Sequence, residues 1–187
     1  MLQIIAGIFK NRRLAVPKGT TTRPTSALVR AAVFNILQNH IEGTHVLDLC
    51  AGSGAMGFEA LSRGAASVNF VEKDRGAALC IKENITLLKV ENTAKVVQSN
   101  ALSALSYYAK TQAKFDLIYI DPPYEHMALA LNCIQLIDEF QLLSPQGWLI
   151  MESGQKQLPP PLIHLSLEDT RSYGKSYLLF LRPSKQL

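Results

Sequence analysis

The sequence predicts an α/β fold, a three-layer sandwich around a mostly parallel, seven-stranded sheet. It adds a C-terminal antiparallel hairpin and a small N-terminal hairpin-and-helix extension. From Thr44 onward, runs rich in branched and aromatic residues alternate with segments of helical periodicity. Such alternation is typical of parallel strands covered by helices on both faces. The last two apolar runs have only a polar turn between them, which favours an antiparallel pair.

The alternating region predicts a definite order of elements, in a domain of residues 43–187 that follows an extension of residues 1–42. Strands are predicted at His45–Leu49, Ser67–Glu72, Ala94–Gln98, Phe115–Ile120 and Gly147–Glu152. Helices are predicted between them at about Ala55–Arg63, Arg75–Leu88, Leu102–Lys110 and Met127–Leu142. The final hairpin is predicted from Leu162–Glu168 and Tyr173–Arg182, joined by the turn Asp169-Thr170-Arg171-Ser172.

The extension begins with apolar pieces on either side of a basic turn, which predicts a hairpin that presents Lys10, Arg12 and Arg13 to solvent. A helix is expected next, with Thr25 or Ser26 as its N-cap. The apolar side chains of this helix recur at helical spacing and form one face, which leaves Arg30 on the other side. The residues of the predicted apolar face are Val29, Val33, Ile36 and Leu37.

The basic character of the chain is confined to this extension. The net charge is +4 and the isoelectric point is about 9.0. Residues 1–41 contain six basic and no acidic side chains, whereas the rest of the chain contains 13 basic and 15 acidic ones. An isolated basic segment is the electrostatic footprint expected for a polyanion such as RNA or DNA. A solvated extension without a partner is the alternative. The six residues are Lys10, Arg12, Arg13, Lys18, Arg23 and Arg30.

Cysteine usage and hydropathy indicate a cytoplasmic protein. The three cysteines, Cys50, Cys80 and Cys133, are far apart and form no CxxC pair, which fits reduced thiols and argues against a zinc site. No apolar run approaches the roughly 18–20 residues needed to span a bilayer. The N-terminus is apolar first and basic afterwards, the reverse of a secretory signal.

A glycine loop after the first predicted strand indicates a nucleotide-like ligand. Gly52-Ser53-Gly54 and Gly57 match G-x-G-x-x-G, and Glu72 ends the next strand at the offset expected for an acid that binds ribose hydroxyls. A dinucleotide is therefore one hypothesis. Asp48, just before the loop, would repel a pyrophosphate but suits the ammonium group of S-adenosylmethionine, whose sulfonium is also positive. A role for Asp48 as a cap of the loop is the alternative.

Two further strand ends are expected at the same edge of the sheet. Phe115–Ile120 is followed by Asp121-Pro122-Pro123-Tyr124, where the prolines stop the strand because they lack the N–H that a ladder needs. A carboxylate, a proline carbonyl and an aromatic face suit a planar ring that carries an amine; an ordinary turn is the alternative. Asn100 and the Ala101 N–H can bind adenine, or Asn100 can cap the next helix, and both can hold.

These motifs, in this order, resemble those of Rossmann-type S-adenosylmethionine-dependent methyltransferases. More narrowly, the chain resembles the RsmD-like family of 16S rRNA guanine-N2 methyltransferases over nearly its whole length. The segments that carry the resemblance are Ile4-Ile5-Ala6-Gly7, Arg12-Arg13-Leu14, Arg23-Pro24-Thr25-Ser26, Val33-Phe34-Asn35-Ile36-Leu37, Val46-Leu47-Asp48-Leu49, Gly52-Ser53-Gly54, Phe70-Val71-Glu72, Asp121-Pro122-Pro123-Tyr124 and Tyr173-Gly174.

The resemblance implies methyl transfer from S-adenosylmethionine to a guanine N2 amine in 16S rRNA. The substrate would be the small ribosomal subunit or an assembly intermediate, and the enzyme a monomer without a metal. Its implied catalytic residues are Asp121, Pro122 and Tyr124. The implied donor site comprises Asp48, Gly52, Ser53, Gly54, Glu72, Lys73, Asn100 and Ala101. The implied RNA contacts are Lys10, Arg12, Arg13, Arg23, Arg30 and Pro123.

The chain departs from the family pattern at a few positions. Ala27, Leu28 and Ala31 stand where the family usually has Asp, Arg and an acid, Asn100 stands where it usually has Asp, and Asn11 replaces a glycine. Three other functions compete with the guanine-N2 assignment. They are amino methylation of adenine N6 in DNA or RNA, RNA binding by an assembly factor without catalysis, and nicotinamide-dependent oxidoreduction.

Overall fold

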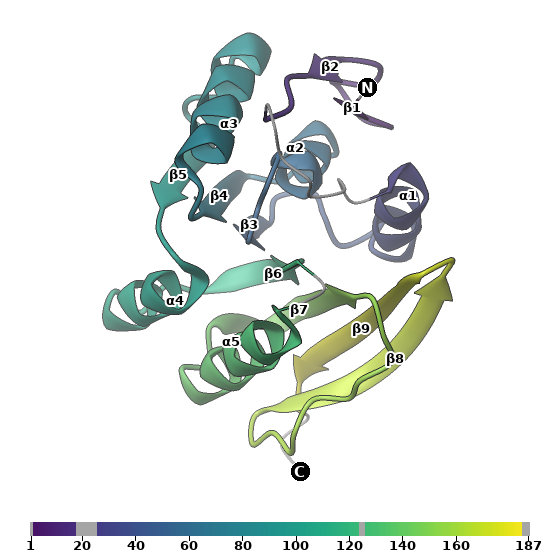
Figure 1. Cartoon of the computed structure of the whole chain (residues 1–187), viewed down its shortest axis with the longest axis vertical. Coiled ribbons are helices and arrows are strands. Elements are labelled where there is room, and N and C mark those ends of the chain that lie inside the picture. The colour runs from purple at the N-terminus through teal and green to yellow at the C-terminus, as the bar shows by residue number, and fades with distance from the viewer. Residues whose placement is uncertain (1, 18–25, 124–125, 185–187) are drawn as a thin grey trace.

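The computed structural model of the protein describes residues 2–17, 26–123 and 126–184. Its main sheet has seven strands in the order β5-β4-β3-β6-β7-β9-β8 (Figure 1). Strands β3 to β7 run parallel, and β9 is antiparallel to both β7 and β8. The predicted fold class is therefore confirmed. The strands are β3 His45–Leu49, β4 Ser67–Glu72, β5 Ala94–Gln98, β6 Phe115–Ile120, β7 Leu143–Ser153, β8 Leu165–Tyr173 and β9 Ser176–Pro183.

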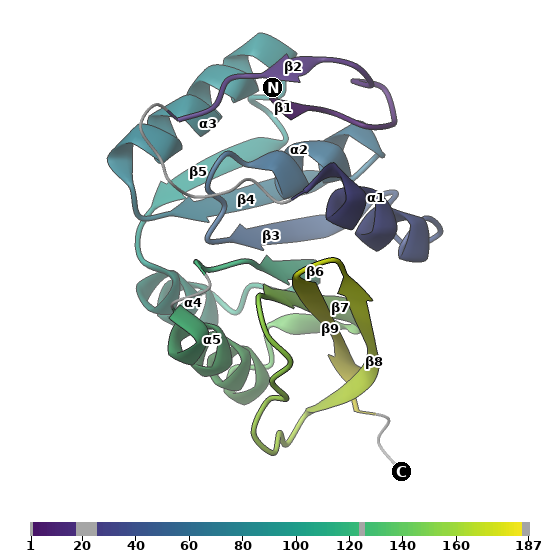
Figure 2. The same cartoon turned by 45° about the vertical axis from the view of Figure 1, so that its right-hand side comes forward.

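Helices cover both faces of this sheet (Figures 1 and 2). Side chains of α1, α2 and α3 belong to one hydrophobic cluster, and those of α4 and α5 belong to a second cluster on the opposite face. Because helices cover both faces, the central strand β6 is apolar almost throughout. The helices are α1 Ala27–Ile36, α2 Ala55–Ser62, α3 Arg75–Leu88, α4 Ala101–Lys110 and α5 Met127–Glu139.

The C-terminal hairpin exists, but its predicted turn is wrong. Residues 169–172 belong to β8, and the turn lies at Gly174 and Lys175, between the paired residues Tyr173 and Ser176. Gly174 has φ 61°, which a glycine adopts without strain. The polar run misled the prediction because β8 is an edge strand, in which polar side chains face water. Strand β7 also begins earlier than predicted, at Leu143, and shifts register between Phe115 and Leu117 of β6.

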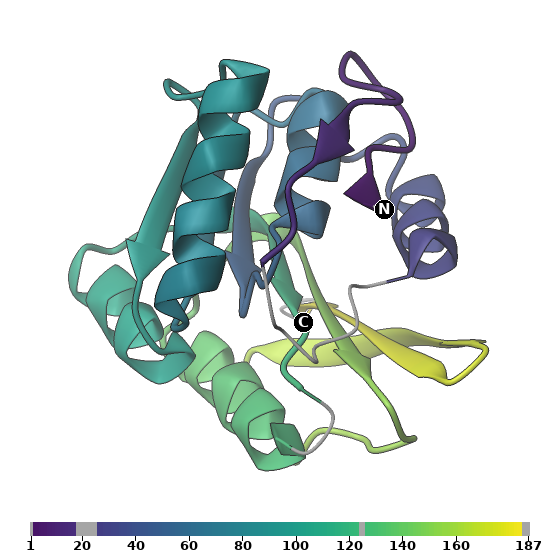
Figure 3. The same ribbon diagram turned by 45° about the horizontal axis from the view of Figure 1, so that its top comes forward.

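The N-terminal segment forms the expected hairpin, from β1 Leu2–Gln3 and β2 Arg13–Leu14. Figures 1 and 3 show it lying over α2, between α3 and α1. The Glu59 carboxylate of α2 is fully buried and accepts hydrogen bonds from the Ile5 and Ala6 N–H groups at 2.8 and 3.0 Å. The segment therefore shares one core with the rest of the chain.

Helix α1 begins after Ser26, whose hydroxyl accepts a hydrogen bond from the Val29 N–H, as predicted. Two other expectations for this helix are wrong. Ile36 is 37 % exposed, and Arg30 is only 3 % exposed and donates from Nη2 to the Gln3 carbonyl at 3.0 Å. The helix packs on α2 and also contacts the N-terminal segment through Arg30, so its buried stripe is wider than the apolar spacing suggests.

Candidate active site

Four acidic residues end neighbouring parallel strands on the α1–α2 face of the sheet. We call Asp48, Glu72, Asp121 and Glu152 the carboxylate edge. In register, Asp48 of β3 pairs with Phe70 of β4 and with Tyr119 of β6. Because side chains alternate along a strand, Glu72 and Asp121 follow two residues later on the same face. Glu152 stands in the same relation to Ile150, the β7 partner of Tyr119.

Asp48 is a buried carboxylate at the centre of this edge. It is 3 % exposed, and its Oδ2 accepts a hydrogen bond from the Gly57 N–H at 2.9 Å. This bond caps the first turn of α2, not the glycine loop itself. Burial raises the pKa of Asp48 to about 7, and the charge of Glu72 contributes to the increase, although the Gly57 bond opposes it. A nearby positive charge would favour the ionised form.

The glycine loop is held by Glu72, whose exposed fraction is 8 %. Its Oε2 accepts a hydrogen bond from the Gly52 N–H at 2.7 Å, and its Oε1 accepts one from the Asp74 N–H at 2.8 Å. Gly52 and Gly54 both have positive φ, 55° and 75°. A Cβ at Gly52 would meet no atom within 4 Å, so the loop surface is open there.

Gly57 has a different role from the loop glycines. A Cβ at this position would lie 2.2 Å from the Phe70 ring, so the missing side chain lets α2 pack closely on β4. Ser53 lies half-buried in the loop, and Lys73 is exposed beside Glu72. The loop therefore combines an open backbone surface with a tightly packed support.

Asn100 lies next to this loop at the end of β5. The Ser99 N–H donates to the Glu72 carbonyl at 3.1 Å, which places Asn100 and Ala101 close to Glu72. Asn100 Oδ1 accepts a hydrogen bond from the Ser103 N–H at 2.9 Å and so caps α4, which confirms one of its two predicted roles. Its side chain is exposed, and Ala101 is buried.

The end of β6 contributes Asp121 and the two prolines to the edge. Asp121 is half-buried, and its charge raises the pKa values of both Cys50 and Tyr119, in each case after the larger effect of burial. The Pro123 carbonyl accepts a hydrogen bond from the His126 N–H at 2.8 Å. The Pro122 carbonyl accepts no hydrogen bond from the part of the chain that the structure describes. Tyr124, also expected here, lies outside the described residues.

Glu152 was not anticipated from the sequence as a site residue. It is 3 % exposed; its Oε2 accepts a hydrogen bond from the Tyr119 hydroxyl and its Oε1 one from the Ser176 hydroxyl, both at 2.6 Å. Glu152, in β7, therefore links β6 to β9. Its contact on β6, Tyr119, lies two residues before Asp121. Its position at a strand end, like those of Asp48 and Glu72, is the signal that could have indicated it.

The expected RNA-contacting side chains fall into three groups. Lys10, Arg12 and Arg13 are exposed on the N-terminal hairpin, as predicted. The prediction that Arg30 contacts RNA is wrong, because its guanidinium is buried against the N-terminal segment and is not available to a polyanion. Arg23 lies outside the described residues, and Pro123 is half-buried beside Asp121.

The carboxylate edge fits a cationic ligand better than a phosphate. Asp48 and Glu72 hold backbone amides, and neither forms an ion pair with a lysine or arginine among the residues described. The ammonium and sulfonium of S-adenosylmethionine would offset this negative charge. Across the described ranges, no cluster of His, Cys, Asp or Glu has the arrangement of a metal site, and no helix is long and apolar enough to cross a membrane.

The sheet order and the antiparallel β9 define a Rossmann-like fold of the methyltransferase type. The solved structure of yhhF from Escherichia coli superposes with a TM-score of 0.86 at 33 % identity, with 98 % of each chain covered. A Thermus thermophilus 16S rRNA N2 methyltransferase (RsmC), solved in complex with AdoMet and guanosine, shares the fold, with a TM-score of 0.67 at 22 % identity, over 89 % of this chain and 45 % of that one.

Sequence comparison identifies the family. Residues 2–182 match the family described as Conserved hypothetical protein 95. The Haemophilus influenzae protein named Ribosomal RNA small subunit methyltransferase D is 37 % identical over 181 residues, which is 96 % of this chain and 93 % of the relative. The chain therefore belongs to this family, the RsmD family.

Proposed function

We propose that this protein transfers a methyl group from S-adenosylmethionine to the exocyclic N2 amine of a guanine in 16S rRNA. One observation carries this proposal. At the end of β6 the Asp121 carboxylate is followed directly by the Pro122 carbonyl, which accepts no hydrogen bond from the described residues. Two acceptors on one rigid turn match the two N–H groups of an amine. The family relatives named for the small-subunit rRNA support the choice of substrate.

The donor would be held by the other half of the edge. Asp48 would bind the ammonium group and Glu72 the ribose hydroxyls, since both carboxylates already lie at the glycine loop. Gly52, Ser53 and Gly54 would form the floor, with Lys73 at the rim. Asn100 and the Ala101 N–H would contact adenine, because they follow β5 beside Glu72.

Catalysis would depend mainly on positioning. The bound donor supplies an electrophilic methyl group on a positively charged sulfur, which becomes a neutral thioether. Asp121 and the Pro122 carbonyl would accept the two N–H hydrogens and turn the nitrogen lone pair out of the ring plane, toward the methyl carbon. As the N–C bond forms and the C–S bond breaks, the amine proton becomes acidic, and Asp121 can take it. Stacking on Tyr124 would hold the base in line.

RNA binding would involve the basic hairpin. Lys10, Arg12 and Arg13 are exposed on a segment that is anchored to α2 by Glu59, so their charges are presented from a fixed support. Such charges bind phosphates without reading sequence. Arg23 and Pro123 would complete the contact surface. The partner would be the small ribosomal subunit or an assembly intermediate, and the enzyme would act as a monomer in the cytoplasm.

Mapping of rRNA modifications tests this function. We expect 16S rRNA from cells without the gene to lack one N2-methylguanine, and purified protein to restore it with labelled donor, as detected by nucleoside mass spectrometry. Small subunits, naked 16S rRNA and DNA should be compared as substrates. Methylation at adenine N6 would overturn the guanine assignment. Donor binding without transfer to any of the three substrates would favour a non-catalytic assembly factor.

A further inference from the structure

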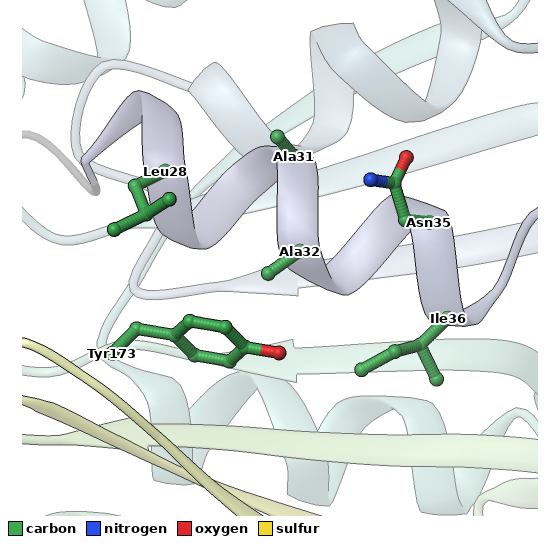
Figure 4. Close-up of a pocket in the computed structure, with 6 residues that line it drawn as sticks. All are labelled: Leu28, Ala31, Ala32, Asn35, Ile36 and Tyr173. Atoms are coloured by element: carbon green, nitrogen blue, oxygen red, sulfur yellow. The ribbon is translucent and has the colours of Figure 1, made fainter.

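A groove lies between helix α1 and the tip of the C-terminal hairpin, outside the carboxylate edge. Its volume is about 420 Å³. Figure 4 shows the Tyr173 ring of β8 facing α1, across from Leu28, Ala32 and Ile36. Two of these apolar side chains are solvent-accessible, Leu28 at 62 % and Ile36 at 37 %. The lining residues are Leu28, Ala31, Ala32, Asn35, Ile36 and Tyr173.

The groove is structurally tied to the strand that ends at Asp121. Tyr173 pairs with Ser176 across the hairpin turn, and the Ser176 hydroxyl donates to Glu152 at 2.6 Å. The other oxygen of Glu152 accepts from the Tyr119 hydroxyl, also at 2.6 Å, and Tyr119 lies two residues before Asp121. The hairpin tip, and with it one wall of the groove, is thus fixed to β6 through one buried carboxylate.

The charge around the groove favours a polyanion. Helix α1 contains no acidic residue, so its wall of the groove carries no negative charge. Lys175 is exposed in the turn next to Tyr173, and Lys10, Arg12 and Arg13 are exposed on the N-terminal hairpin, which lies beside α1 (Figure 3). An aromatic ring, aliphatic side chains and one amide, with an exposed lysine beside them, are the chemistry that recognises a nucleobase on a phosphate backbone.

We propose that this groove binds the base of a nucleotide near the target guanine in the RNA strand. The base stacks on the Tyr173 ring against Leu28 and Ile36, and the Asn35 amide contacts its polar edge. Holding a neighbouring base fixes the strand next to the carboxylate edge, which helps to keep the target nucleotide out of its own stack. The inference rests on the proposed function, since it requires RNA at the carboxylate edge.

The test compares Tyr173→Ala with Tyr173→Phe in methyl transfer to 16S rRNA. We expect Tyr173→Ala to raise the KM for RNA about tenfold, because base–aromatic stacking is lost, and to leave kcat at saturating RNA within about twofold. Tyr173→Phe keeps the ring and should stay within about threefold of the wild type. The donor Kd, measured by calorimetry, should not change in either variant. An unchanged KM in Tyr173→Ala would overturn the proposal.

A second pair of variants guards against misfolding and non-specific charge effects. Leu28→Asp places an acid at an exposed position in the first turn of α1, where it suits the helix dipole. Leu158→Asp makes the same change at another exposed leucine, 55 % accessible, outside the groove. Leu28→Asp should weaken RNA binding about tenfold more than Leu158→Asp, with equal melting temperatures. Equal RNA affinities would contradict the proposal.

Two measurements on the wild type distinguish a base-binding groove from a dimer interface and from an enzyme that does not act on RNA. If sedimentation shows a wild-type dimer that Tyr173→Ala dissociates, the groove binds a second copy of the chain and the proposal fails. If the wild type methylates no RNA, the proposed function fails, and the groove proposal fails with it. If the wild type methylates RNA and both groove variants behave like their controls, the groove proposal alone is wrong.

Discussion

The two halves of the carboxylate edge are built differently. On the donor half, the ends of β3 and β4, Asp48 and Glu72 bind backbone amides of Gly57, Gly52 and Asp74. On the acceptor half, the ends of β6 and β7, Glu152 binds the side-chain hydroxyls of Tyr119 and Ser176. On the donor half, the carboxylates that we propose to bind the ligand are therefore the same ones that hold the backbone. On the acceptor half, Glu152 makes the supporting contacts, and we propose that Asp121 carries the chemistry.

The largest expected effect comes from the acceptor half. Asp121→Ala should lower kcat for methyl transfer at least a hundredfold, because it removes both the hydrogen-bond acceptor that orients the amine and the proton acceptor. The donor Kd should stay within about threefold of the wild-type value. Transfer of labelled methyl groups and calorimetry measure the two quantities. An Asp121→Ala enzyme with near wild-type kcat would refute the mechanism.

The donor half should lose binding and stability together. Glu72→Ala removes the acceptor of both the Gly52 and the Asp74 N–H groups. We expect the donor Kd to rise at least tenfold and the free energy of unfolding to fall by about 1–3 kcal/mol. Glu72→Gln keeps one carbonyl oxygen, so its donor Kd and its stability should lie between those of the wild type and of Glu72→Ala. Denaturant unfolding and calorimetry measure the two quantities. A loss of donor binding without any loss of stability would show that Glu72 does not also support the fold, which contradicts the proposed difference between the two halves.

Asp48 should make donor binding depend on pH. Its pKa of about 7 means that the carboxylate is mostly protonated at pH 6 and mostly ionised at pH 7.5. Donor affinity should therefore rise severalfold over this interval, since the ammonium prefers the ionised form. Above about pH 8 the donor's own α-amino group loses its proton and affinity should fall again. Asp48→Asn should bind weakly and remove the rising limb; a rising limb that persists in Asp48→Asn would assign it to another group.

The same residue links donor binding to stability. The pKa of Asp48 is higher in the folded protein than in the unfolded chain, where it is close to 3.8. The unfolded chain therefore binds fewer protons between these values, and the free energy of unfolding falls as pH rises from about 4 to 7. Asp48→Asn keeps an oxygen for the Gly57 N–H and removes this loss. We expect the ligand-free variant to melt at a higher temperature than the wild type at pH 8.

The smallest effects should come from the basic surface. The double variant Arg12→Ala and Arg13→Ala should weaken RNA binding and reduce the slope of log K against log salt concentration by about 1.5, the amount expected for two lost phosphate contacts. Arg30→Met provides the contrast, because Arg30 is buried. It should lower stability and leave the salt slope unchanged. A slope that falls in Arg30→Met and not in the double variant would reverse our assignment.

The sequence by itself determined the four strands β3 to β6 and the positions of the candidate chemistry along the chain. The bounds of β3, β4, β5 and β6 are those predicted. The central strand β6 is the clearest case, because a parallel strand covered on both faces is a nearly continuous apolar run. The glycine loop, Glu72 and Asp121 also stand where they were expected, since each follows directly from the end of a strand.

Only the tertiary structure decided which side chains meet. Arg30 was expected in solvent, but a helix that packs on two sides buries residues outside its apolar stripe. Glu152 meets Tyr119 and Ser176, 33 and 24 residues away, because the sheet places β7 between β6 and β9. The groove opposite Tyr173 likewise joins an N-terminal helix to a C-terminal hairpin. Periodicity reports on local neighbours, and such contacts depend on strand order, which no local pattern encodes.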